Sequence, residues 1–209
     1  MKNAATKPAS KEPLEQYRQL VALLADRVRS VAEGFQTDAY VTGRSGVGKT
    51  YTVRQTLGQY KTQSTYLNGR ITPAALYDTF EEHPEAIFII DDVPLLFANL
   101  QASQILMAAA GGDPGNIRLI TYLTKNQSRA TKFRGGIIAI SNIALAQDPA
   151  GQALASRFAL HHFDPTDEML DAFLTKTAAR GCGGVAAHEA LKILDYVRTL
   201  CRESSRSGS

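Results

Sequence analysis

The sequence predicts an α/β fold in which helices cover both faces of a five-stranded parallel sheet. Short apolar runs alternate with helical patterns, and the runs at 87–90 and 137–140 contain no polar residue. Strands of a parallel sheet have this composition because the crossover helices shield both faces from water. With 209 residues, 44% of them hydrophobic, the chain is long enough for one such core and a small appendage.

The predicted elements follow one another after a polar segment at 1–12, which we expect to be a mobile tail. Pro13 opens an amphipathic helix that Gly34 ends. Thr72 caps a later helix and Pro73 takes its first position. Strands are expected at 39–42, 64–67, 87–90, 137–140 and 158–163. Further helices are expected at 49–57, 99–110 and 149–156.

The C-terminal part is expected to be helical and without strands. Thr166 caps a helix whose first turn holds Asp167 and Glu168, where acidic side chains favour the positive end of the helix dipole. A glycine-rich break at 181–184 separates this helix from another amphipathic one. We therefore expect a main domain at 13–164, a helical lid at 165–202 and a disordered tail at 203–209.

A phosphate-binding loop is the most specific motif. Residues 43–50 match the pattern G-x-x-x-x-G-K-[ST], between a predicted strand and a predicted helix. Its glycines let consecutive backbone N–H groups converge on phosphates, and a glycine-rich turn that happens to contain Lys is the alternative. We expect Lys49 to reach the β- and γ-phosphates and the Thr50 hydroxyl to bind Mg²⁺. The triphosphate-binding residues are then Gly43, Arg44, Ser45, Gly46, Val47, Gly48, Lys49 and Thr50.

Residues suited to hydrolysis follow two apolar strands. Asp91 is expected to hold the Mg²⁺ shell, and Asp92 is expected to orient or deprotonate the attacking water. Asn142 can hydrogen-bond both the γ-phosphate and that water without adding charge. Arg157 is expected to act as an arginine finger on a neighbouring subunit's nucleotide. The alternatives are a solvated turn for the two Asp residues, a simple strand end for Asn142 and a helix C-cap for Arg157.

These residues together resemble the AAA+ superfamily over about 43–163, and Asp91, Asp92 and Asn142 are similar to those of superfamily 3 helicases and related viral or mobile-element ATPases. The resemblance implies an ATP hydrolase that uses Mg-ATP and works as a ring oligomer, with a hexamer expected. It also implies action on DNA or RNA as a helicase-like, replication or mobile-element factor, with a replication or transposition protein as a further partner. The second sensor arginine of many AAA+ lids has no counterpart at 184–188.

A basic insert at 113–136 lies between the two acids and Asn142. Its five basic residues and one acid give it a net charge of +4, more than the +3 of the whole chain. Strands at 117–123 and 130–134 predict a hairpin. In related helicases a hairpin at this place holds the nucleic-acid backbone. We expect phosphate contacts from Lys125, Arg129, Lys132 and Arg134, the alternative being a solvated hairpin whose charges protect an exposed edge.

Other functions stay open from the sequence. The main alternative is an ATP-dependent loader or regulator of a protein partner, whereas protein threading is disfavoured because the link at 68–71 lacks an aromatic residue. A small-molecule kinase is disfavoured because 166–179 contains no Arg. Cys182 and Cys201 have no metal or disulfide spacing, which fits a reducing compartment. No run is long enough to span a membrane, so a cytoplasmic protein without a membrane partner is expected.

Overall fold

The structure is a computed structural model that describes residues 12–124, 127–145 and 149–207. Most of the tail predicted at 1–12, the last two residues of the tail at 203–209, and Lys125 therefore lie outside the described residues. The chain forms two compact units: one is Val21–Asp164, and the other combines the residues before Val21 with those after Asp164. None of the described helices has the length and apolar character needed to cross a lipid bilayer.

The larger unit confirms the α/β class and the five-stranded parallel sheet. The strand order is β2-β3-β6-β1-β7, and every neighbouring pair is parallel. The strands are β1 Asp38–Thr42, β2 Ser64–Asn68, β3 Ile87–Asp91, β6 Gly136–Ser141 and β7 Leu160–His162. β7 is shorter than the predicted strand at 158–163 because Phe158 is buried against Tyr40 in the core, with ring centroids 6.0 Å apart, before the strand begins.

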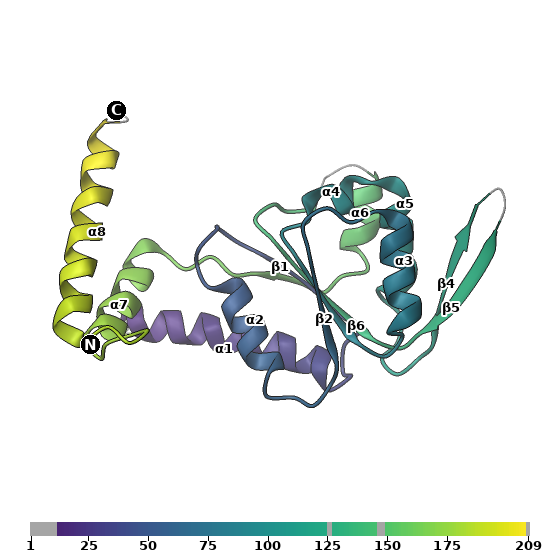
Figure 1. Cartoon of the computed structure of the whole chain (residues 1–209), viewed down its shortest axis with the longest axis horizontal. Helices are drawn as coiled ribbons and strands as arrows, with labels where there is room; N and C mark the ends of the chain where they lie inside the picture. The colour runs from purple at the N-terminus through teal and green to yellow at the C-terminus, as the bar shows by residue number, and fades with distance from the viewer. Residues whose placement is uncertain (1–11, 125–126, 146–148, 208–209) are drawn as a thin grey trace, which may run out of the picture. The chain divides into compact units, whose positions relative to one another are not determined.

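Helices cover both faces of the sheet (Figure 1). One face carries α3 (Pro73–Glu82), α4 (Pro94–Ala98), α5 (Leu100–Ala109) and α6 (Pro149–Ala155), and the other carries α2 (Lys49–Leu57) and the later part of α1 (Pro13–Ala32). The sequence did not predict α4, which has Pro94 at its first position. Asn99 then caps α5, because its side chain accepts a hydrogen bond from the backbone N–H of Ala102 at 3.0 Å.

The main apolar core lies between the sheet and the α3–α6 face. Phe80, Phe88 and Phe133 pack against one another there, with ring centroids 4.7 to 5.8 Å apart. Burying each such ring contributes roughly 1.5–3 kcal/mol. Phe133 belongs to the insert between β3 and β6, so the core also anchors the base of that insert.

A buried carboxylate fixes the amino edge of the sheet. Asp38, at the start of β1, accepts hydrogen bonds from the backbone N–H groups of Gly111 at 2.8 Å and Ala159 at 2.9 Å, and from the Thr37 hydroxyl at 2.8 Å. These donors come from the segments that follow α5 and precede β7. Asp38 therefore fixes the strand that leads directly into the 43–50 loop.

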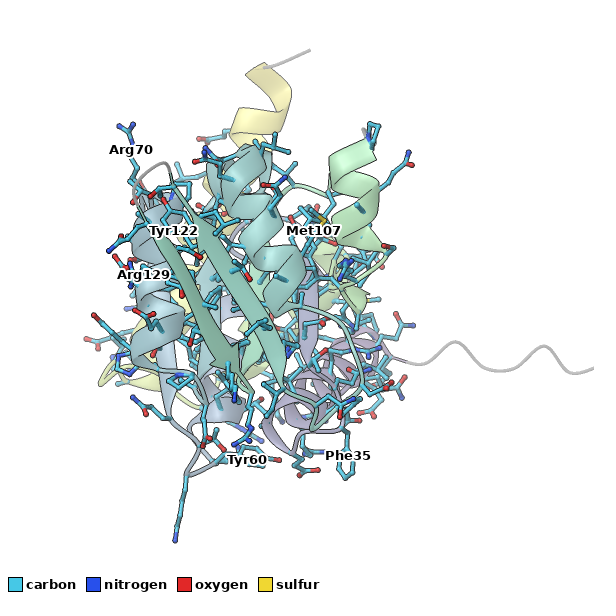
Figure 2. The ribbon with its side chains drawn as sticks, turned by 90° about the vertical axis from the view of Figure 1, so that its right-hand side faces the viewer. Phe35, Tyr60, Arg70, Met107, Tyr122 and Arg129 are labelled. Atoms are coloured by element: carbon cyan, nitrogen blue, oxygen red, sulfur yellow. The ribbon has the colours of Figure 1, made fainter. Side chains whose placement is uncertain are left out.

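The insert forms an antiparallel hairpin of β4 (Arg118–Leu123) and β5 (Ser128–Phe133), which lies alongside α3 and α5 (Figure 2). β5 begins two residues earlier than the predicted strand at 130–134, and the backbone N–H of Thr124, just after β4, bonds the Gln127 carbonyl at 2.8 Å. Arg129 therefore belongs to a strand and not to the link between the two predicted strands.

The smaller unit contains α7 (Asp167–Ala178), α8 (Ala187–Ser207) and the first residues of α1. Ala178, Ala190 and Leu194 form its small core, and the ring of Tyr17 stacks on that of Phe173 with centroids 4.5 Å apart. The start of α1 thus groups with the C-terminal helices and not with the main domain expected at 13–164. α8 continues to Ser207, where the sequence predicted disorder from 203, because adding residues to an existing helix is easier than starting one.

Candidate functional site

A cavity of about 360 Å³ opens at the carboxyl edge of the sheet, where β1, β3 and β6 end. β6 lies between β1 and β3, so Asn142 stands between the 43–50 loop and the two acids that end β3. Ligands of open α/β sheets bind at this edge. The lining residues are Ser45, Gly46, Gly48, Lys49, Thr50, Tyr51, Asp91, Asp92, Ile140, Ser141 and Asn142.

The loop before α2 has a backbone that glycine adopts far more readily than other residues. Gly43, Gly46 and Gly48 have φ angles of 150°, 77° and 103°. A Cβ atom at Gly43 would lie only 1.8 Å from the carbonyl oxygen of Phe163, next to the end of β7. Lys49 then begins α2. A glycine-rich turn that runs into a helix N-terminus is a backbone arrangement suited to binding anions.

Three residues of the predicted phosphate-binding set, Gly43, Arg44 and Val47, do not line the cavity. Val47 is buried in the protein interior. The Nε of Arg44 donates to Asp164 Oδ1 at 2.8 Å, and this bond holds the pKa of the Asp164 carboxyl below its usual value. Arg44 therefore connects the 43–50 loop to Asp164, the last residue of the larger unit.

Lys49 is the one cation among the described residues that line the cavity. Only 6% of its surface is exposed, and its Nζ donates to the carbonyl oxygens of Gly43 and Arg44, both at 2.6 Å, and to Asn142 Oδ1 at 2.9 Å. Burial lowers the pKa of the Lys49 amine, and the negative charges of nearby Asp residues oppose that shift. The amine thus links the loop to the end of β6.

Asp91 accepts two hydroxyl hydrogen bonds at the same oxygen. Thr50 Oγ1 donates to its Oδ2 at 2.9 Å, and the Tyr66 hydroxyl donates to Oδ2 at 2.5 Å. No pattern in the sequence distinguishes Tyr66, which belongs to β2. Burial raises the pKa of Tyr66 to about 12, and the bond to Asp91 acts in the same direction.

The oxygens of Thr50 and Asp91 fit a Mg²⁺ ion that is held partly by phosphate. Within the described residues, no group of three or more His, Cys, Asp or Glu side chains could hold a metal ion. Mg²⁺ commonly takes one or two protein oxygens and completes its shell with water and substrate phosphates. A hydroxyl and a carboxylate 2.9 Å apart, beside the 43–50 loop, match that donor set.

Asp92 has an unusual backbone for a residue other than glycine. Its φ is 53°, in the left-handed region, and its backbone N–H continues the parallel ladder to the Ile140 carbonyl at 3.0 Å. Asp adopts this conformation more readily than most residues, and strain of this kind often occurs at functional sites. Asp92 lines the cavity and is exposed, whereas the preceding Asp91 is buried and hydrogen-bonded.

Arg157 lies at the opposite edge of the sheet from this cavity. Its guanidinium donates to the Met107 carbonyl at 3.0 Å, and it lines a separate hollow together with Phe35 and Asp38. Asp38 begins β1, whereas the loop follows the end of β1. The structure therefore does not bring Arg157 together with the cavity of its own chain.

Arg129, predicted to bind nucleic acid, is paired within the protein. Its guanidinium donates to Asp78 Oδ1 at 2.7 Å and to Glu81 Oε2, both on α3. It also lies 4.7 Å from the centre of the Tyr77 ring. Figure 2 looks onto the hairpin and labels Arg129. These contacts fasten β5 to α3, so the side chain has less freedom to contact a phosphate.

The other basic residues of the insert differ in their surroundings. Lys132 is exposed on β5, whereas Arg134 lies beyond the strand with Glu85 3.4 Å away. Arg118 is buried, and its guanidinium donates to the carbonyls of Ala109 and Gly135. Lys125 lies outside the described residues. The basic excess seen in the sequence therefore includes one buried cation, Arg118, and two cations that face carboxylates, Arg129 and Arg134.

Comparison with known proteins does not show which family the chain belongs to. No protein-family model matches the chain, and no curated protein matches it. The functional proposal is therefore based on the cavity and on the motifs that line it.

Gly43→Ala is expected to lower the free energy of unfolding by roughly 2–4 kcal/mol, because the new methyl group would overlap the Phe163 carbonyl. Gly69→Ala is the matched control, since Gly69 also has a positive φ, 79°, but open space around its Cβ position. That change is expected to cost about 1 kcal/mol. Urea unfolding measures both, and equal losses would contradict the close approach at Gly43.

Proposed function

We propose that this chain is an ATPase of the AAA+ P-loop class, which binds Mg-ATP in the cavity at the carboxyl edge and hydrolyses it. One observation carries the proposal. The hydrogen bonds Lys49–Asn142 and Thr50–Asp91 join residues 93 and 41 positions apart in the sequence. Residue types suited to binding phosphate, binding metal and promoting hydrolysis therefore lie close together, which supports the proposal.

The residues have separate tasks in this proposal. The loop backbone and the Lys49 ammonium bind the triphosphate. Thr50 and Asp91 hold Mg²⁺, which neutralises phosphate charge when bound. Asp92 accepts the proton of the attacking water, and Asn142 hydrogen-bonds that water or the γ-phosphate. Lys49 already donates three hydrogen bonds to protein oxygens, so a phosphate oxygen replaces at least one of them.

The resemblance to AAA+ proteins adds a lid and a ring to the proposal. The helices α7 and α8 would form the lid, and several copies, with six expected, would form a ring in the cytoplasm. Arg157 lies away from the cavity of its own chain. In a ring it would instead act on the nucleotide of a neighbouring copy. ATPase activity per subunit is therefore expected to rise with protein concentration until assembly is complete. The same specific activity at every concentration would remove Arg157 from the reaction.

The macromolecule that the ATPase acts on has two candidates. The resemblance to superfamily 3 helicases favours DNA or RNA, and a replication or mobile-element role. The hairpin favours a protein partner, with the ATPase as its loader or regulator. Arg129 is paired with carboxylates, and the outer face of β4 exposes Leu119 and Leu123, which are 60% and 69% accessible. Exposed apolar residues of this kind are more typical of protein contacts than of contacts with a phosphate backbone.

The experiment that tests the proposed function is the rate of phosphate release from ATP with Mg²⁺ or with EDTA. Repeating it with single-stranded DNA, single-stranded RNA and duplex DNA at two salt concentrations distinguishes the two targets. Stimulation that weakens with salt and is reduced in Lys132→Ala supports nucleic acid. Absence of stimulation by all three supports the protein partner. No Mg-dependent release under any condition would contradict the ATPase itself.

A further inference from the structure

The Tyr66 side chain reaches Asp91 because of the strand register. Tyr66 is paired with Ile89, and Asn68 is paired with Asp91, so Tyr66 and Asp91 are diagonal neighbours on the same face of the sheet. Diagonal neighbours are within reach of a long side chain. The Tyr66 hydroxyl spans that diagonal and donates to Asp91 Oδ2 at 2.5 Å.

The Tyr66 ring is also held by α2, the helix that carries Thr50. The guanidinium carbon of Arg54 lies 5.0 Å from the ring centre. Arg54 follows Thr50 by four residues, so both side chains lie on one face of α2. Tyr66 and Thr50 therefore approach Asp91 from two different elements, and both bond its Oδ2.

We infer that Tyr66 is a positioning residue that orients the Asp91 carboxylate for Mg²⁺, an inference that rests on the proposed function. Two hydroxyl donors on Oδ2 fix the plane of the carboxylate before the metal arrives, and neither bond uses Oδ1. A carboxylate that is already oriented loses less conformational freedom when it joins the metal shell. Tyr66 need not contact the nucleotide to have this effect.

Tyr66→Phe removes the hydroxyl and keeps the ring. The Mg²⁺ concentration that half-saturates ATP hydrolysis is expected to rise about tenfold, since residues that orient metal ligands affect metal affinity by that order. Affinity for a fluorescent ATP analogue in EDTA is expected to stay within about twofold, because the loop and Lys49 are unchanged.

Tyr60→Phe is the matched control. The Tyr60 hydroxyl, labelled in Figure 2, also donates to a carboxylate, that of Glu33 at 2.9 Å, but Glu33 does not line the cavity whereas Asp91 does. Its Mg²⁺ dependence is expected to equal that of the wild type. A general loss of structure in Tyr66→Phe would weaken binding equally with Mg²⁺ and with EDTA, and would lower the melting temperature.

The possible outcomes separate this inference from the proposed function. If the wild type binds Mg-ATP and Tyr66→Phe has the same Mg²⁺ dependence, or loses binding equally in EDTA, Tyr66 does not position Asp91. If the wild type has no Mg²⁺-supported affinity for ATP, the proposed function fails, and this inference fails with it. A selective rise in the Mg²⁺ requirement of Tyr66→Phe, absent in Tyr60→Phe, supports the role of Tyr66.

Discussion

Lys49→Ala is expected to lower ATP affinity at least about a hundredfold and to abolish turnover. The variant removes the one cation among the described residues that line the cavity, and that cation is buried. A buried charge interacts more strongly with phosphate than an exposed one, because water screens it less. Burial also lowers the pKa of Lys49, so affinity is expected to fall on the alkaline side at a lower pH than for an exposed lysine. Titration with a fluorescent ATP analogue at several pH values measures both effects.

Two controls separate the lost charge from lost structure. Lys49→Ala also leaves the Gly43 and Arg44 carbonyls without this donor, which destabilises the loop. Lys49→Met also removes the charge and the donor but retains an unbranched side chain of similar length, so it is expected to lose ATP binding with a smaller loss of packing and stability. Lys61→Ala changes an exposed lysine and is expected to behave as the wild type. Normal ATP affinity in Lys49→Met would contradict the proposed role.

Asp92→Asn is expected to keep ATP affinity within about threefold and to lower the turnover rate by at least about a hundredfold. The amide has nearly the same size as the carboxylate but cannot accept the proton of water. Asn also tolerates the left-handed φ of 53° at this position, so the fold is expected to persist. Equilibrium titration and single-turnover phosphate release measure binding and chemistry separately.

Asp113→Asn is a suitable control for this change, because Asp113 is exposed and does not line the cavity. It is expected to leave both measurements unchanged. Loss of ATP binding in Asp92→Asn would make Asp92 part of the binding site and not the proton acceptor. Normal turnover in that variant would remove Asp92 from the proposed reaction.

The sheet could be predicted because its strands carry strong local signals. β3 and β6 consist mainly of Ile, Phe and Ala and are buried along their whole length. The helix cap at Thr72 could also be predicted from residue type. The Thr72 side chain accepts a hydrogen bond from the Ala75 N–H at 3.2 Å. The residues at the ends of β3 and β6 could be grouped in advance, because parallel strands end at one edge.

Contacts between distant side chains could not be predicted in the same way. Tyr66 bonds a residue 25 positions away, and no local pattern distinguishes it from any other strand tyrosine. Arg129 pairs with Asp78, 51 positions away. No local pattern indicates this pairing, and the charge of Arg129 therefore contributes to the basic excess of the insert in the sequence. Arg118, the first residue of β4, is buried. A charge count along the chain cannot identify which cations the fold neutralises or buries.

Isothermal titration of the whole chain with ATP, with Mg²⁺ and with EDTA, tests the central claim most directly. We expect a saturable site whose affinity is higher with Mg²⁺, because the proposed metal ligands Thr50 and Asp91 lie beside the proposed phosphate-binding loop. Lys49→Met should remove that binding, and Lys61→Ala should retain it. Absence of magnesium-supported binding of ATP by the folded wild-type chain would contradict the account.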